Sequence, residues 1–497
     1  MKQTLKAKAG ILAVLTLLVS AAAAQEKPAP PKDPRVVNPA EPIKPEGAKP
    51  GEEAVTPAPT ASADRKPLLG TESFSLGILA DGRSFLNGNL SVSLQGDSNI
   101  NSLAGTGVNW HFGSAFGGNI SLQKIWGQNA NLNVNYSGGG RIYDTNQSGA
   151  NGIFQRLTFS TGFMVRRFQI TVNDSFSYSP ESNGSIGGIG GGSFGGVFGG
   201  GLGGSIPGSG FSGLGTGGSF LLPGTLPNQT ILAGQDKRWS NTIGGSVNYA
   251  LSPRNSLTFA GSYGMLRFID GNFIDSNSFQ GQAGFSRQLN AADSLGFSYG
   301  VSLVRFVGVS DKIDSHSFRL NYGRRITGRT AIQLFVGPQV SLFSNPNSGS
   351  DTRVNWAMSA SVLHNFGRMN ANIRYFHGIT GGSGVFIGAQ TDRVQVGLSR
   401  TFGRYWSASF GGGFARNENL QQTSLLPLQR HFYAFDANAH IGHPIGRHGS
   451  ISLFYTFTRQ TTNFNFCTPG TLSCGNLTYR HNIGLNFAWG FGPINLE

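Results

Sequence analysis

Five arginines occupy positions that alternate with apolar residues in the second half of the chain. They are Arg319, Arg353, Arg374, Arg393 and Arg480. A period of two is typical of a β-strand whose two faces meet different surroundings. If the aromatic positions face outward, these arginines and Asp436 face inward, where charged side chains on a pore wall set ion selectivity. We predict that they line a pore that favours anions, although they could instead bond to loops or fill a plugged interior.

One acidic residue departs from this arrangement. Asp174 lies at an alternate position in the segment that contains Phe168, Ile170 and Val172, so the same rule places its carboxylate on the outward, apolar face. Either Asp174 lies near one rim of the structure or the strand register changes there.

The two cysteines form the second candidate for chemistry. Cys467 and Cys474 lie close together in "FCTPGTLSC", where Pro469 and Gly470 favour a turn between them. An even cysteine count in an exported chain favours a disulfide. The spacing lacks the paired ligands of a zinc site, and it is no C-x-x-C redox motif. We therefore predict a Cys467–Cys474 disulfide that stiffens a loop.

Other reactive groups give no catalytic or cofactor site. Asp436 and His440 share a strand face but would be about 13 Å apart, too far to pair. Gly208, Gly210 and Gly213 match G-x-G-x-x-G, yet the strand and helix that this motif requires are missing. The net charge of +14 is spread out without a dense basic run. We expect no enzyme activity, metal, cofactor or nucleic-acid partner.

The N-terminal region has the features of an exported chain. Lys2, Lys6 and Lys8 precede a short apolar core at 11–19, and Ala22 to Ala24 match a cleavage site, so residues 1–24 are predicted to be a signal peptide. Residues 25–70 contain half of the 22 prolines of the chain, mixed with Lys, Glu and Ala. Such a composition cannot bury a core, so we predict a disordered periplasmic tether.

From residue 71 onward the sequence alternates in long segments. The last of them places Ile483, Leu485, Phe487, Trp489 and Phe491 on one face. Charged residues make up only 12% of the chain, against roughly 25% in soluble domains. Strands that cross a bilayer need about 9–11 residues, and a sheet in lipid must close on itself. The pattern therefore predicts an all-β fold, a transmembrane antiparallel β-barrel over residues 71–497.

The connections between these segments alternate in length. Short turns are expected near Arg166, Ser252, Asn290, Gly328, Gly367, Gly403 and Pro444, and longer connections separate them. Outer-membrane barrels have short periplasmic turns and long extracellular loops. The count gives roughly 16–20 strands, with 18 favoured, the size of barrels that hold a channel. The longest connection, the glycine-rich 179–236, is then extracellular, as a contact surface or as a constriction.

This pattern resembles bacterial outer-membrane β-barrel proteins of the general porin type over residues 71–497. The strand from Ile483 to Phe491 looks like the closing strand that such proteins present to the barrel assembly machinery, although this chain continues to Glu497. The resemblance implies the outer membrane of a Gram-negative-type bacterium, with its lipid and assembly machinery as partners. We expect a passive channel for small polar or anionic solutes. The alternative is a structural barrel whose extracellular loops bind a partner or matrix polymer, and the oligomeric state stays open.

Overall fold

The computed structural model describes residues 84–99, 109–126, 130–145, 151–179, 237–269, 274–345, 349–380, 388–403, 405–420, 431–467 and 474–496. These residues form eighteen strands. In chain order they are β1 (Phe85–Asp97), β2 (His111–Trp126), β3 (Ala130–Tyr143), β4 (Gly152–Val165), β5 (Phe168–Ser179), β6 (Arg238–Ser252), β7 (Asn255–Phe268), β8 (Ser276–Gln288), β9 (Asp293–Phe306), β10 (Lys312–Thr327), β11 (Thr330–Asn345), β12 (Gly349–Asn365), β13 (Met369–Thr380), β14 (Ala389–Phe402), β15 (Trp406–Asn419), β16 (His431–Ile445), β17 (Gly449–Cys467) and β18 (Cys474–Asn495).

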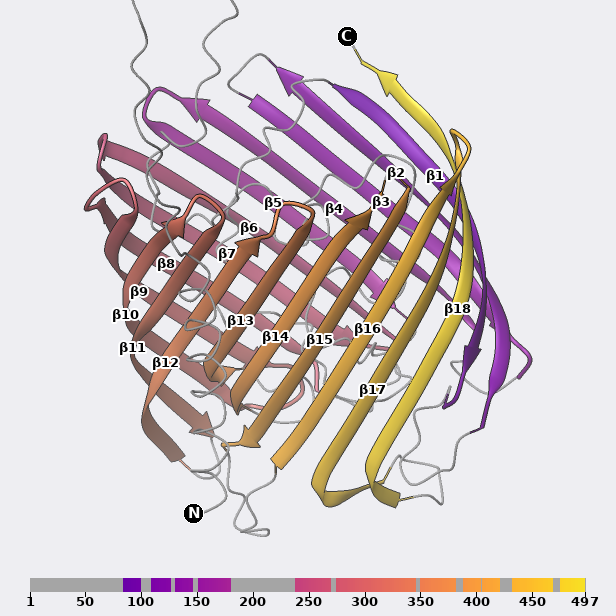
Figure 1. The fold of residues 1–497 in the computed structure, drawn as a ribbon. Helices are drawn as coiled ribbons and strands as arrows, with labels where there is room; N and C mark the ends of the chain where they lie inside the picture. The colour runs from indigo at the N-terminus through magenta and orange to yellow at the C-terminus, as the bar shows by residue number, and fades with distance from the viewer. Residues whose placement is uncertain are drawn as a thin grey trace, which may run out of the picture. The chain divides into compact units, whose positions relative to one another are not determined.

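The strands make one closed antiparallel barrel (Figure 1). Each strand pairs with the next along the chain, from β1–β2 to β17–β18. The ring closes where β1 pairs with β18, from Phe85↔Asn495 to Asp97↔Asn482. The predicted fold class is confirmed, including the favoured count of 18. Residues His111 to Trp126 make one strand and not a hairpin.

With one exception, the connections are sorted by length between the two ends of the barrel; the exception is 346–348 between β11 and β12, which is as short as a turn where a longer loop was expected. At one end, here the turn end, the strands are joined by short segments such as 166–167, 253–254, 328–329 and 366–368. The other end, here the loop end, has the connections 180–237, 307–311 and 420–430 among others. Gly446 in the β16–β17 turn has φ +66°, a conformation that favours glycine. The predicted alternation of turns and loops is therefore present in the fold.

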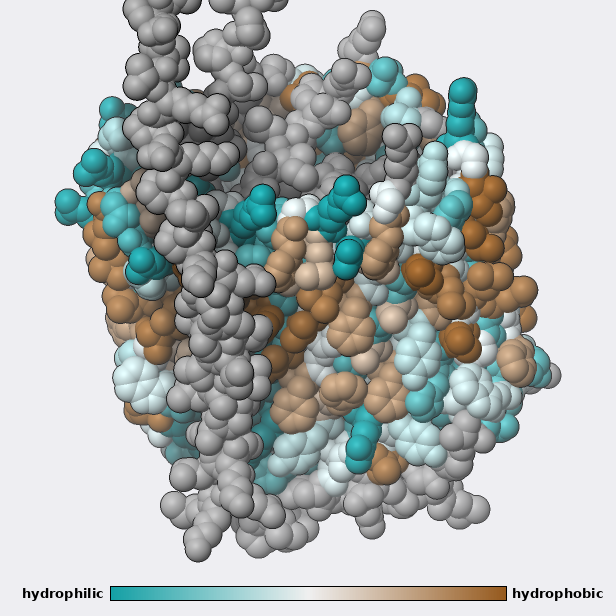
Figure 2. Space-filling model, viewed as in Figure 1, coloured by the Kyte–Doolittle hydropathy of each residue, from teal (hydrophilic) through white to brown (hydrophobic). Residues whose placement is uncertain are grey.

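The two faces of the wall have opposite character. On β1, Leu90, Val92 and Leu94 are 65%, 55% and 65% exposed, while Ser91 and Ser93 between them are buried. Figure 2 shows many hydrophobic residues on the visible outer wall, with paler and hydrophilic residues between them. Among the described residues, no helix is long and apolar enough to cross a membrane. Closure pairs each strand with a neighbour on both sides over most of its length, and the apolar outer face suits lipid, so the fold is that of an outer-membrane β-barrel.

The wall is irregular between β12 and β13. Their ladder runs only from Asn365↔Asn370 to Met358↔His377. On its other side β12 stays paired with β11 to its end, at Asn345↔Gly349. The edge of β12 that faces β13 therefore has no strand partner between Gly349 and Ala357 among the described residues.

The end of β13 is bonded to β11 instead. The side-chain amide of Gln339, on the lumen face of β11, accepts a hydrogen bond from the Ile379 N–H (3.1 Å) and donates one to the Ile379 carbonyl (3.4 Å). These two hydrogen bonds replace those that the Ile379 backbone would make with β12 in a continuous ladder. The loop end of β13 is thus displaced behind β12, toward the barrel interior.

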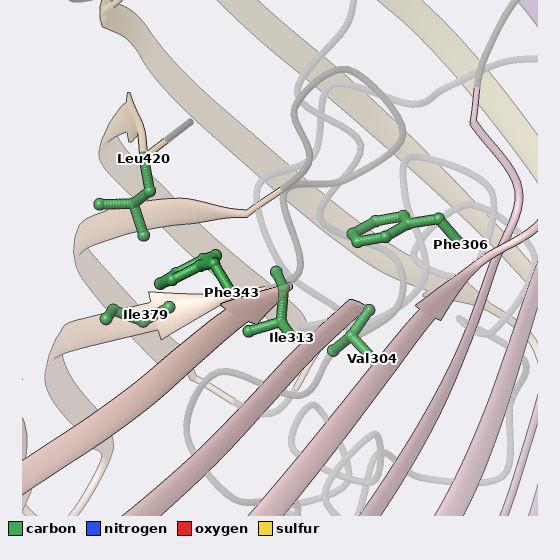
Figure 3. Packing of buried hydrophobic residues seen from close by; sticks show 6 residues of the cluster. All are labelled: Val304, Phe306, Ile313, Phe343, Ile379 and Leu420. Carbon is green, nitrogen blue, oxygen red and sulfur yellow. The ribbon is translucent and has the colours of Figure 1, made fainter. Parts of the chain in front are cut away.

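A buried apolar group, here the inner cluster, holds this displaced end (Figure 3). Its members are Val304, Phe306, Ile313, Phe343, Ile379 and Leu420. Gly388, which precedes β14 with φ +83°, also lies against it, because a Cβ there would come within 2.9 Å of both Ile313 and Phe343. The ends of β13, β14 and β15 are therefore packed against β9, β10 and β11.

Several sequence predictions concern residues outside the described ranges. The signal peptide, the tether and the start of the barrel domain at residue 71 all fall within 1–83. The glycine-rich connection falls almost wholly within 180–236. They remain predictions.

Candidate functional site: the lumen-facing wall

The register places the predicted pore-lining arginines on the lumen face. Arg319 and Arg393 are 8% and 5% exposed, and they share that face with buried serines and asparagines of their neighbours. Arg374 lies opposite Gln395 of β14, which is the residue two positions after Arg393. Arg374 and Arg393 are therefore diagonal neighbours on the inner wall.

Asp436 completes this part of the wall. It lies opposite Gly413 of β15, where a Cβ would come within 2.5 Å of the Asp436 Oδ1 atom. The missing side chain therefore makes room for the carboxylate. Asp436 also interacts electrostatically with Arg393 of β14, across the intervening strand β15. The structure thus brings Arg374, Arg393 and Asp436 together, as neighbours that the sequence did not identify.

The other two predicted arginines are bonded to acids. Arg353 donates from Nε to Asp351 (2.9 Å) and lies over the ring of Phe343, 5.8 Å from its centroid. Arg480 binds Asp97 through Nε, at 3.0 Å to Oδ1 and 2.8 Å to Oδ2, and through Nη2. Asp97 itself is fully buried. Both arginines have a carboxylate partner, so they add less net positive charge to the lumen than the sequence suggests.

The sequence reasoning missed several lumen-facing arginines, three of them on β3, β4 and β6. Arg141 lies opposite the buried Ala115, and Arg156 and Arg238 lie opposite Ser177 and Ser179 of β5. The alternation in the sequence did indicate this face, because Arg141 lies at the same alternate positions as the polar residues Asn133, Asn135 and Ser137.

Two lumen-facing guanidinium groups, those of Arg238 and Arg319, are buried without an acidic partner. Arg238 and Arg319 are 9% and 8% exposed, and neither makes an ion pair with any described residue. The Arg238 Nη1 and Arg319 Nε atoms have no hydrogen-bond acceptor there. An uncompensated buried charge is costly, and a carboxylate or phosphate would satisfy it. These groups are the points on the wall where an anion would gain the most.

The cysteine pair is placed by the backbone at the loop end of the last hairpin. Cys467 and Cys474 are directly opposite each other in the β17–β18 register. Directly opposed residues in an antiparallel pair have Cα atoms about 4.5–5.5 Å apart, within the range of a disulfide. The register is therefore compatible with the predicted bond.

No protein-family model matches the chain, and no curated protein matches it significantly. Several solved structures are similar to this chain at low sequence identity. OpdQ of Pseudomonas aeruginosa is 10% identical over 84% of this chain and 100% of its own, with a TM-score of 0.38. OccK5 of the same organism is 11% identical over 82% of this chain and 98% of its own, with a TM-score of 0.40. The outer membrane protein OpdK, also from P. aeruginosa, is 9% identical over 82% and 99%, with a TM-score of 0.39. At these values the similarities carry no argument about a solute.

The described part of the chain contains no group of three or more His, Cys, Asp or Glu side chains arranged to hold a metal ion. The chemistry that the wall offers is therefore that of fixed charges and hydrogen-bond donors.

Proposed function

We propose that the barrel is a passive outer-membrane channel for small anionic solutes. Barrels of about 16–18 strands are wide enough for an aqueous channel. The lumen face is polar, and its charges are mainly arginines. The observation that carries the proposal is the burial of Arg238 and Arg319 on that face with no acidic partner among the described residues.

The test is the ion selectivity of the full-length protein in planar bilayers. Under a KCl gradient we expect open-channel current with a reversal potential that indicates anion preference. A contact between unit charges in water contributes about 1 kcal/mol, which corresponds to about fivefold in relative permeability. The double variant Arg238→Gln/Arg319→Gln should lower the preference by up to that factor for each charge removed, because it takes positive charge from the lumen wall.

The matched control removes two positive charges elsewhere. Arg254 lies in the β6–β7 turn, and Arg400 is exposed on the outer face of β14. Arg254→Gln/Arg400→Gln should leave the reversal potential unchanged. Absence of open-channel current would refute the channel, and a cation preference in the unmodified protein would refute the anionic solute class.

We also propose that Cys467 and Cys474 form a disulfide at the loop end of β17 and β18. Mass spectrometry of peptides from the exported protein, digested without reductant, should show them linked, with a mass two hydrogens below that of the reduced peptides. Recovery of both thiols free after alkylation under the same conditions would contradict the bond.

A further inference from the structure

Asp174 lies on the outer face of the barrel wall. Its register neighbours are Phe159 on β4 and Ile243 on β6, and Ile243 is 49% exposed. The strand keeps its register through this position. The parity that places Asp174 outward is therefore correct, and the register change considered from the sequence does not occur.

The carboxylate lies within the apolar belt and not beyond it. Toward the turn end, β5 continues with Val172, Ile170 and Phe168, and the Phe168 ring contacts Tyr249 at 4.6 Å between centroids. Toward the loop end, the Phe176 ring contacts Trp239 at 6.4 Å. Aromatic pairs therefore lie on both sides of Asp174 along the strand, as expected for a position between the two interfaces of a bilayer.

One hydrogen bond ties Asp174 to its surroundings. The Asn241 side-chain amide donates from Nδ2 to the Asp174 Oδ1 atom at 2.9 Å. Asn241 lies on the same outer face of β6, opposite Phe176 and Met265. Among the described residues none makes an ion pair with Asp174, and the Arg267 guanidinium on β7, diagonal to Asn241, lies over the Trp239 ring. The second carboxylate oxygen and the second amide hydrogen have no partner there, and a carboxylate in this state is costly against lipid.

Three outward positions beside this pair carry no side chain. Gly245, Gly261 and Gly281 lie side by side in register on β6, β7 and β8, at the outward position next to Ile243. Missing side chains allow another surface to approach the backbone closely. The glycines would allow any surface to approach the backbone. The choice of partner therefore depends on Asp174 and Asn241.

We propose that the outer face of β5 to β8 is a contact between two copies of this chain, centred on Asp174 and Asn241. The pair offers one free acceptor and one free donor at the same place, so it is self-complementary. Across a twofold axis the Asn241 amide of each copy can donate to the Asp174 carboxylate of the other, in an isologous interface. The contact removes both groups from lipid and gives each carboxylate a second hydrogen bond.

The first experiment detects the contact by cysteine cross-linking of the full-length protein in lipid nanodiscs. Cys467→Ser/Cys474→Ser serves as the background, and Ile243→Cys is added beside the polar pair. Because Ile243 is next to the proposed axis, oxidation should produce a cross-linked dimer. Leu398→Cys, on the outer face of β14 across the barrel, is the matched control and should stay monomeric.

The second experiment asks whether the polar pair holds the copies together. Asp174→Leu/Asn241→Leu removes donor and acceptor and makes the face more lipophilic, so the barrel should still fold. We expect loss of the Ile243→Cys cross-link and a shift from dimer to monomer in native mass spectrometry. Asp174→Asn keeps an acceptor at residue 174 and should retain the dimer. Folding of each variant is checked by its heat-modifiable gel mobility.

Several outcomes would overturn the proposal. One is a monomer in native mass spectrometry with no cross-link at Ile243→Cys. A second is equal cross-linking at Leu398→Cys, which would indicate nonspecific collision. A third is cross-linking of Ile243→Cys only to another outer-membrane protein in cells, and a fourth is a dimer that survives Asp174→Leu/Asn241→Leu.

Discussion

The barrel wall contains two junctions that differ in how they are held. Where β1 meets β18, the ladder runs the length of the strand and ends in the buried Arg480–Asp97 ion pair. Where β12 meets β13, the ladder stops at Met358↔His377, and the displaced end of β13 packs into the inner cluster. The first junction is closed by backbone pairing and charge, and the second by apolar contacts and one side-chain amide.

The difference shows two ways to satisfy the hydrogen-bonding groups at the ends of strands in a closed sheet. At the β1–β18 junction, Asp97 also accepts from the Asn99 N–H, and Ser98 exchanges hydrogen bonds with His481, so the polar groups are bonded on both strands. At β12, the Trp356 N–H is bonded by the side chain of Asn355, its own neighbour. The closing junction therefore combines a full backbone ladder with buried polar contacts, whereas the end of the β12–β13 junction depends on apolar packing and the Gln339 side chain.

The largest effect is expected at the closing junction. Arg480→Ala leaves the fully buried Asp97 carboxylate without its ion-pair partner. Breaking a buried pair in this way costs about 3–5 kcal/mol. The free energy of unfolding, measured by urea titration with tryptophan fluorescence in detergent micelles, should fall by that amount.

The control for this prediction is the Arg353–Asp351 pair near the β12–β13 junction. The Asp351 side chain is 62% exposed, so water replaces the lost partner. Arg353→Ala should therefore change the free energy of unfolding by about 0–1 kcal/mol. Equal losses for Arg480→Ala and Arg353→Ala would contradict the contrast between the junctions.

An intermediate effect is expected in the inner cluster. Ile313 is 1% exposed, and Ile313→Ala removes its contacts with the displaced strand ends. We expect a loss of about 2–3 kcal/mol in the free energy of unfolding, the lower part of the range for such truncations, because the site borders the lumen. No change in the urea midpoint would show that the cluster does not stabilise the junction.

The smallest effect is expected from the Gln339 side-chain amide, which is hydrogen-bonded to the Ile379 backbone. Gln339→Ala removes both hydrogen bonds to the Ile379 backbone, at a cost of about 1 kcal/mol. Hydrogen exchange at the Ile379 amide should become faster, while exchange at Ile373, which is still paired with Val362 of β12, stays the same. Unchanged exchange at Ile379 would mean that the Gln339 side chain does not protect the Ile379 amide.

Most of the fold could be predicted from the sequence, because the period of two and the sorting of turns and loops are local signals. The Ile483–Phe491 pattern and the Asp174 parity both hold in the structure. The early end of the β12–β13 ladder could not be predicted. It depends on Gln339 and Ile313, which are distant in sequence from Ile379 and have no unusual local pattern.

The candidate site could be predicted in part. Parity assigns Arg319 and Arg393 to the lumen face, but it cannot say which acid each arginine meets. Arg480 and Asp97 are separated by 383 residues, so their ion pair follows only from closure of the ring. The room that Gly413 leaves for Asp436 likewise depends on the register between β15 and β16, which sequence alternation leaves undetermined.

The same separation of 383 residues has a kinetic consequence. Every other ladder joins strands that are consecutive along the chain and can pair as hairpins, whereas β1–β18 pairing requires the two ends of the barrel to meet. Contacts between distant segments are the slow ones in folding, because loop-closure entropy opposes them until the pairing forms. Until that last step β1 and β18 are both open edges, so an assembly factor that shields them would determine how much of the protein reaches the closed state instead of aggregating.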